Sequence, residues 1–279
     1  MKVYISADME GITGLVDAHD VQPAGRDYEH GRVMMTEDVN AAVRGAFDAG
    51  ATDVLVNDAH GPKRNLLHDQ LDPRARLIKG ASKRMGMFEG LDATFDATLC
   101  VGYHSRAGTL GVMSHTFMGH EIEDIWLDDR PVGEFGMVHA ASAALGVPVL
   151  MLSGDDAACD EAEKWDASTT TVTVKQVRDR FAAELVPAPT ARGMIESSAH
   201  AAIADCRGQF REPARLPEPV TLAVRWQSAT VASHLQGIPG VRLRDSRTIE
   251  TTGQMADLWL LFGVFQRVAG ALTGNHPYC

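Results

Sequence analysis

The sequence predicts an α/β protein with a largely parallel sheet flanked by helices, followed by a smaller second α/β unit. Short apolar runs alternate with helical stretches along the first half of the chain, which is typical of successive βαβ units. With 279 residues, of which 45% are hydrophobic and 23% charged, the chain can bury a substantial core. The pattern changes from about Ser153, so we expect a first domain over residues 1–155 and a second over 156–279.

The elements of the first half follow from apolar runs and turn residues. The apolar runs predict five strands, at Lys2–Ala7, Asp53–Asn57, Arg76–Ile78, Thr98–Gly102 and Val147–Leu152. A helix over about Thr36–Ala49, ended by Gly50, completes the first βαβ unit. The segment IEDIWLDDRPVGEFG predicts two strand segments joined by an Asp-Asp-Arg-Pro turn, and a helix through Met137–Leu145 follows it.

The second half contains longer helical stretches and β-branched runs. Its expected elements are a helix over Asp156–Trp165, a strand in TTTVTVKQV, a helix over Thr190–Ala204, a strand in PVTLAVRW and a terminal helix from Gln254. The most apolar stretch, LWLLFGVF, is far shorter than the roughly 20 residues of a membrane span. We therefore expect a buried or interface helix there and no membrane partner.

Charge and cysteine usage limit the class of protein. The formal net charge of -11 argues against attraction to phosphate backbones or anionic lipid, so we expect no nucleic-acid partner. The cysteines form no C-x-x-C pair, which favours a reducing compartment over a disulfide framework. The N-terminal segment MKVYISADMEG lacks the apolar run of a signal peptide, so a cytoplasmic location is expected.

Acidic and histidine residues follow three of the predicted strands. Asp8 and Glu10 follow the first strand, His60 follows the second, and His104 follows the run TLCVGY. Taken singly, each is more often a solvated, capping or hydrogen-bonded residue. Because ligands bind beyond the carboxyl ends of strands in open α/β sheets, their repetition at strand ends favours one shared site. Imidazoles and carboxylates together suit Zn, Mn, Fe or Co, and a carboxylate can bridge two ions, which predicts a metal-dependent hydrolase.

Five motifs in the first half of the chain resemble those of a known family. They occur in the order SADMEG at 6–11, NDAHG at 57–61, GYHS at 102–105, MSHT at 113–116 and VGEFG at 132–136. In sequence and order they resemble the successive motifs of the zinc-dependent D-aminopeptidases. The resemblance covers about residues 1–155 by motif, and the remainder is compatible in length and layout.

The resemblance implies roles for six residues. It implies that two zinc ions per subunit are held by Asp8, Glu10, His60, His104 and Glu134, with Asp8 as the bridging carboxylate. From its position in the sequence alone, Glu134 would be interpreted as a carboxylate in the first turn of a helix, where it complements the helix dipole. His115 is implied to be the catalytic residue, acting as general base, general acid or nucleophile. We also consider Asp58 and Ser114 as residues that orient a metal-bound imidazole.

The resemblance also implies a substrate and an assembly. The expected activity is hydrolysis of N-terminal D-amino acids, such as D-Ala, from short D-residue-containing peptides, by a homo-oligomer, specifically a decamer. One alternative is a dinuclear metal hydrolase of the same fold that acts on other amides or on L-peptides. Another is a non-catalytic, metal-containing peptide-binding protein.

Overall fold

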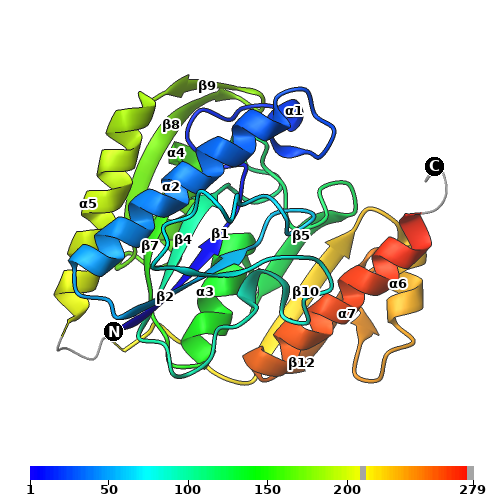
Figure 1. Ribbon diagram of the computed structural model, residues 1–279. Coiled ribbons are helices and arrows are strands. Elements are labelled where there is room, and N and C mark those ends of the chain that lie inside the picture. Colours follow the sequence, from blue (N-terminus) through cyan, green and yellow to red (C-terminus); the bar gives the residue numbers. More distant parts are fainter. Residues whose placement is uncertain (208–211, 275–279) are drawn as a thin grey trace.

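Two β-sheets organise the chain in the computed structural model, which describes residues 1–207 and 212–274 (Figure 1). In the described residues the larger sheet has seven strands. Their order across the sheet is β3 (Arg76–Ile78), β2 (Asp53–Asp58), β1 (Lys2–Ala7), β4 (Ala97–Tyr103), β7 (Val149–Asp155), β8 (Thr170–Asp179) and β9 (Ala182–Leu185). All neighbours pair in parallel except β8 and β9. The predicted largely parallel α/β sheet is confirmed.

The smaller sheet is antiparallel and has five strands in the described residues. Their order is β11 (Arg242–Leu243), β12 (Thr248–Gly253), β10 (Val220–Trp226), β5 (Ile122–Leu127) and β6 (Arg130–Pro131). The predicted hairpin is the β5–β6 pair, and its turn residues Asp128 and Asp129 have φ of 48° and 61°. Aspartate tolerates this left-handed conformation, which matches the twist of a two-residue hairpin.

Strand pairing in both sheets crosses the predicted domain boundary. β7 pairs with β8 across residue 155, and β10 from the second half pairs with β5 from the first. Each sheet therefore combines strands from residues 1–155 and 156–279. The division of the chain at residue 155 stays a prediction, and it coincides with the end of a strand inside the larger sheet.

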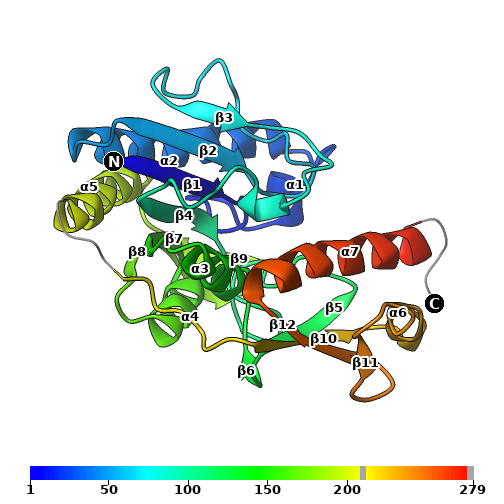
Figure 2. The same cartoon turned by 90° about the horizontal axis from the view of Figure 1, so that it is seen from below.

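Helices cover both faces of the larger sheet (Figures 1 and 2). On one face α2 (Tyr28–Asp48) lies beside α5 (Ala188–Cys206), and on the other lie α3 (Glu134–Ala144) and α4 (Asp156–Trp165). Alternate residues of β1 serve the two cores, with Val3 packed under α2 and Tyr4 in the core that contains α3. The short helices are α1 (Ala18–Val21), the 3-10 turn η1 (Gly86–Phe88) and α6 (Ala229–Leu235).

One predicted helix start, that of α2, was wrong by about two turns of helix. α2 begins at Tyr28 instead of about Thr36, whereas α3 begins at Glu134, where the sequence placed a first-turn carboxylate. The extra turns of α2 contain Gly31, where a Cβ would lie 2.1 Å from the carbonyl oxygen of Asp20. A glycine weakens the helical signal in sequence, but here it allows close packing of the preceding loop.

The terminal helix α7 (Met255–Thr273) packs against α3, α6 and β12 (Figure 2). Trp259, Phe262 and Phe265 are buried, whereas Val264 is exposed. By length and composition it is the one helix in the described residues that could cross a membrane, and 33% of its apolar window is buried inside the protein. Its buried face joins the smaller sheet to the α3 side of the larger one.

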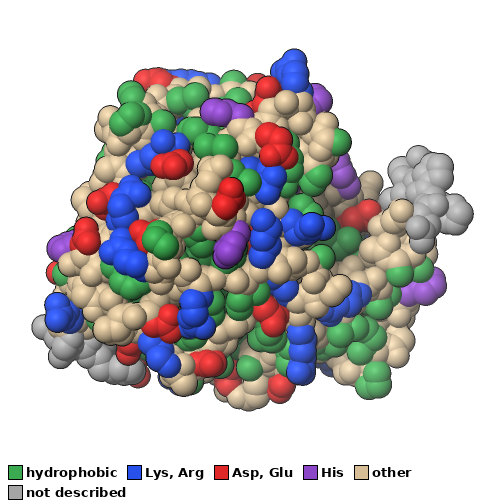
Figure 3. Space-filling model, in the orientation of Figure 1, with side chains coloured by type: hydrophobic (Ala, Val, Ile, Leu, Met, Phe, Trp, Pro, Cys, Tyr) green, Lys and Arg blue, Asp and Glu red, His purple; other side chains and the backbone are tan. Residues whose placement is uncertain are grey.

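The surface mixes charges of both signs. On the face shown in Figure 3, basic and acidic side chains are interspersed, without one continuous basic stripe among the residues drawn in colour. Cys100, Cys159 and Cys206 are buried and free, and Cys279 lies outside the described residues.

Candidate metal centre

The predicted strand-end residues converge at one edge of the larger sheet. β2, β1 and β4 are adjacent and parallel, so the chain leaves all three strands at the same edge. The side chains that follow them are buried, namely Asp8, Glu10, His60 and His104. Gly11 makes this convergence possible, because a Cβ there would lie 1.9 Å from the carbonyl oxygen of Tyr103 at the end of β4.

Asp8 lies between two imidazoles. Its Oδ1 is 3.2 Å from Nδ1 of His60, and its Oδ2 is 3.5 Å from Nε2 of His104. The same nitrogen of His60 is 2.9 Å from Oε2 of Glu10. Each oxygen of Asp8 therefore faces a different histidine, so this carboxylate would be able to help hold two cations.

Glu134 reaches the cluster from α3, the helix that follows the β5–β6 hairpin. It is the first residue of that helix and is buried, with Oε1 3.4 Å from Nε2 of His104. The same oxygen accepts a 2.6 Å hydrogen bond from the backbone N–H of Phe117. Sequence periodicity alone indicated only a carboxylate near a helix N-terminus, because the position of that helix depends on tertiary packing.

Each histidine of the cluster is anchored through one ring nitrogen. Nε2 of His60 lies 2.9 Å from the carbonyl oxygen of Val21, and Nδ1 of His104 lies 3.0 Å from that of Ser105. When a cation replaces the proton on its other nitrogen, an imidazole that donates to a carbonyl from one nitrogen offers a lone pair on the other. In both residues that other nitrogen faces the carboxylates, and this pairing with a carbonyl is common among metal-binding histidines.

Two buried atoms of the cluster lack a hydrogen-bond partner among the described residues: Oδ2 of Asp8 and Nε2 of His104. Buried polar atoms are nearly always paired in folded proteins. A cation between this oxygen and this nitrogen would satisfy both. The donor set contains nitrogen and carboxylate oxygen atoms, which zinc accepts, so the residues present fit the metal that the family resemblance implies.

The ionisation of the cluster reflects its concentrated negative charge. Burial raises the pKa of Asp8, and the charge of Glu10 raises it further. Burial lowers the pKa of His60, but the charges and hydrogen bonds of Glu10 and Asp8 outweigh it and raise this pKa to about 10. Burial opposes ionisation of Glu134 as well, yet His104 lowers its pKa to about 2. The buried carboxylates therefore favour a positively charged group in the site.

His115 lies at the solvent side of the cluster. Its ring stacks on that of His104 with centroids 4.2 Å apart, and its side chain is 20% exposed. Nδ1 lies 2.9 Å from the carbonyl oxygen of Met113, while Nε2 is 3.7 Å from Oε1 of Glu134. His104, His115 and Glu134 also bring ligand atoms within 4.8 Å of one another. The geometry therefore accommodates either a catalytic or a metal-binding role for His115.

Comparison with known proteins identifies the family. A family model described as D-aminopeptidase, of peptidase family M55, matches residues 1–264. The chain belongs to this family. The motif resemblance found in the sequence is thereby confirmed, and this member of the D-aminopeptidase family is an enzyme of the hydrolase class.

Two Bacillus subtilis comparisons agree with the family model. A D-aminopeptidase of strain 168 is 40% identical over 250 residues, which is 89% of each chain. A solved structure described as the zinc-dependent D-aminopeptidase DppA, a self-compartmentalizing protease, has a TM-score of 0.93 and 35% identity, and the match covers 100% of both chains. The fold of this D-aminopeptidase family member is therefore that of the solved protein.

Asp58 organises the loop that carries His60, whose ring has its hydrogen-bond partners elsewhere, in Asp8, Glu10 and Val21. Its carboxylate accepts hydrogen bonds from the backbone N–H groups of Asn65 and Leu66 at 2.6 and 2.8 Å. The side-chain amide of Asn65 then donates to the backbone carbonyl of His60 at 2.7 Å. Ser114 donates to the carbonyl of Thr109. Among the described residues neither side chain forms a hydrogen bond with an imidazole, which differs from the hypothesis from sequence.

Lys175 supports the Glu10 segment, and sequence analysis missed this role. It is buried in β8, and its Nζ donates to the backbone carbonyls of Glu10, Ile12 and Leu15 at 2.5, 3.0 and 2.5 Å. Burial lowers its pKa to about 8. A lysine within the β-branched run TTTVTVKQV was the available signal, since a charged residue in a buried strand needs polar partners.

Proposed function

We propose that this chain is a dizinc aminopeptidase that removes N-terminal D-amino acids, such as D-Ala, from short peptides. The observation that carries the proposal is the position of Asp8 between His60 and His104, with Glu10 and Glu134 completing the two sides. Family membership supports the same activity. The proposed ligands for one zinc are Asp8, Glu10 and His60, and for the other Asp8, His104 and Glu134.

The residues around this centre suit amide hydrolysis. Zinc bound there would polarise the scissile carbonyl and lower the pKa of the attacking water. Nε2 of His115 faces the cluster while Nδ1 lies against the carbonyl of Met113. This orientation suits proton transfer at Nε2, either from the attacking water or to the leaving amine, and it equally suits direct attack by Nε2. Such proton transfer typically contributes about 10²–10⁴ in rate.

The proposed activity is tested by removing the metal and by comparing a D-dipeptide with its L-stereoisomer as substrates. Purified protein is expected to contain two zinc equivalents per chain and to hydrolyse D-Ala-D-Ala much faster than L-Ala-L-Ala. A chelator should abolish the activity and added zinc should restore it, because the proposed chemistry requires the metal. Metal analysis and release of free alanine are the measurements. Faster cleavage of the L-peptide would favour a hydrolase of other specificity, and a zinc-loaded but inert protein would favour a peptide-binding role.

We also propose a homo-oligomer, specifically a decamer, in the cytoplasm. The self-compartmentalizing description of the matched Bacillus structure, which covers the whole chain, supports an assembly. Light scattering of the full-length protein should then give a mass many times the 30.1 kDa of one chain. A monomer at micromolar concentration would contradict this proposal, and recovery outside the cytoplasmic fraction of cells would contradict the location.

A further inference from the structure

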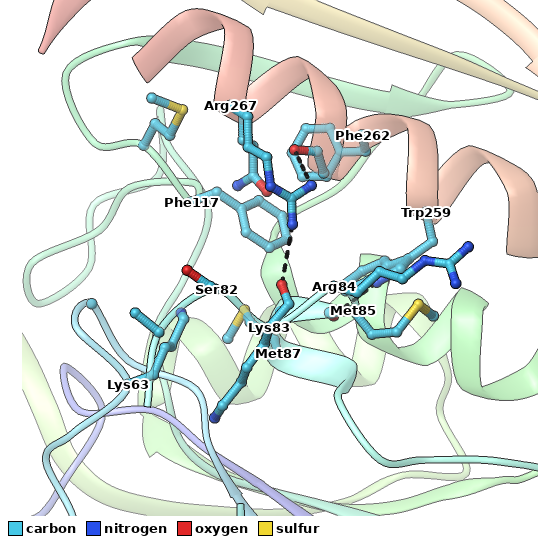
Figure 4. A pocket seen from close by; sticks show the side chains of 16 residues that line it. Lys63, Ser82, Lys83, Arg84, Met85, Met87, Phe117, Trp259, Phe262 and Arg267 are labelled. Atoms are coloured by element: carbon cyan, nitrogen blue, oxygen red, sulfur yellow. Dashed lines mark hydrogen bonds between the residues drawn. The ribbon is translucent and has the colours of Figure 1, made fainter. Parts of the chain in front are cut away.

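A pocket of about 440 Å³ lies beside the metal centre, between the loop that contains η1, the segment around Phe117, and α7 (Figure 4). Its volume is in the range of small-ligand sites. Two lining residues adjoin the cluster: Gly61 follows His60, and the backbone N–H of Phe117 donates to Glu134. A molecule held at the metal centre could therefore extend into this pocket.

One wall of the pocket is aromatic. The ring of Phe117 meets Phe262 edge-on at a centroid distance of 4.8 Å and Trp259 at 6.2 Å. The indole N–H of Trp259 donates to the carbonyl of Met85 at 3.0 Å, which fixes the loop against α7. This packing gives a rigid apolar surface that can contact a side chain or the backbone of a short peptide.

The remaining lining is cationic. Four lysine and arginine residues line the pocket, and no acidic residue is among the described lining residues: the cations are Lys63, Lys83, Arg84 and Arg267. In the part of the chain that the structure describes, none of the four forms an ion pair. Such a concentration of unpaired cations stands out in a chain of net charge -11.

The four cationic side chains differ in how many of their hydrogen-bond donors are already bonded within the protein. Nζ of Lys83 donates to the side chain of Asn57 and to two backbone carbonyls, and Arg267 donates to the carbonyls of Gly263 and Lys83. Arg84 is exposed, with neither a hydrogen bond nor an ion pair among the described residues. Its guanidinium therefore keeps its full set of donors for a carboxylate.

We propose that this pocket binds the C-terminal carboxylate end of the substrate, so that the enzyme prefers short peptides with a free C-terminus. The inference rests on the proposed function, in which the N-terminal end of the peptide is held at the metal centre. The aromatic wall contacts the leaving residue, and Arg84 with its cationic neighbours pairs with the terminal carboxylate. Substrate selection then depends on both ends of the peptide.

The test compares D-Ala-D-Ala with its C-terminal amide, which differs only in the terminal charge. The wild-type protein should cleave the acid with a kcat/KM at least about tenfold above that of the amide, because a charge-assisted hydrogen bond is lost with the amide. Arg84→Ala should remove most of this preference by raising KM for the acid, and leave cleavage of the amide nearly unchanged. Arg242→Ala, on exposed β11, is the matched control and should behave as wild type.

Calorimetric binding of both peptides separates this proposal from the proposed function. If the protein hydrolyses neither peptide but binds the acid more tightly than the amide in an Arg84-dependent manner, the pocket stands and the aminopeptidase proposal fails. Equal binding or equal cleavage of acid and amide by the wild-type protein would overturn the pocket assignment. An equal loss on both peptides in Arg84→Ala would also overturn it, since the amide reports on folding and on the metal centre.

Discussion

Asp8→Asn is expected to lower kcat/KM for D-Ala-D-Ala by at least about a thousandfold, since a lost cation removes several kcal/mol of transition-state stabilisation. Each oxygen of Asp8 faces a different histidine, at 3.2 and 3.5 Å. An asparagine amide keeps one acceptor oxygen but replaces the other with a donor, so it cannot bridge two cations. We therefore expect zinc content to fall from two equivalents to one or fewer, as measured by metal analysis after dialysis.

The matched control for this substitution is Asp53→Asn. Asp53 begins β2 at the opposite end of the same sheet and pairs with Arg76 at the surface. Surface ion pairs contribute little, so activity and zinc content should stay within about twofold of wild type. Because asparagine is isosteric and can still accept the backbone hydrogen bond of Met9, the Asp8 variant should fold. A variant with two zinc equivalents and near-normal turnover would show that Asp8 bridges nothing.

His115→Ala is expected to lower kcat by about 10²–10⁴ while zinc content stays normal, because a positioned histidine contributes roughly that much through proton transfer. Its Nε2 is 4.0 Å from Oε1 of Glu10 and 3.7 Å from Oε1 of Glu134, close enough to reach a reacting group held at the cluster. The partly exposed ring can be removed without leaving a sealed cavity. Turnover of D-Ala-D-Ala and metal analysis of the same preparation are the two measurements.

The control for this experiment is His120→Ala, which removes an exposed histidine from the same segment. It should retain wild-type turnover and zinc. If His115→Ala instead loses zinc together with activity, His115 is a metal ligand, a role that its position beside His104 and Glu134 also accommodates. Unchanged turnover with full zinc content would remove His115 from both roles.

The strand-end part of the site could be predicted because its signals are local. Apolar runs marked β1, β2 and β4, and Asp8, His60 and His104 lie within two residues of the strand ends. Parallel strands that are adjacent in a sheet end at the same edge, so their convergence followed from fold class. Gly11 was also visible in sequence, and the structure gives its reason, since any side chain there would collide with the end of β4.

Residues outside the parallel strands gave weaker signals. Glu134 lies beyond a hairpin that belongs to the other sheet, so its distance from His104 depends on how α3 packs between the two sheets. Only the resemblance to known motifs selected it in sequence. Lys175 was missed because its partners are backbone carbonyls more than 150 residues earlier in the chain. Hydrogen bonds over such separations leave no periodic pattern.

The sequence by itself determined the α/β class and the place of acidic and histidine residues at strand ends, because alternation and turn chemistry act over a few residues. Tertiary structure alone decided that Asp8 lies between two histidines. It also decided that β8, which follows residue 155, pairs with β7 in the larger sheet. It decided as well that Trp259 of α7 and Phe117 pack together beside the candidate metal centre. Those contacts arise when remote segments bury their apolar faces together, and that packing is a property of the folded chain as a whole.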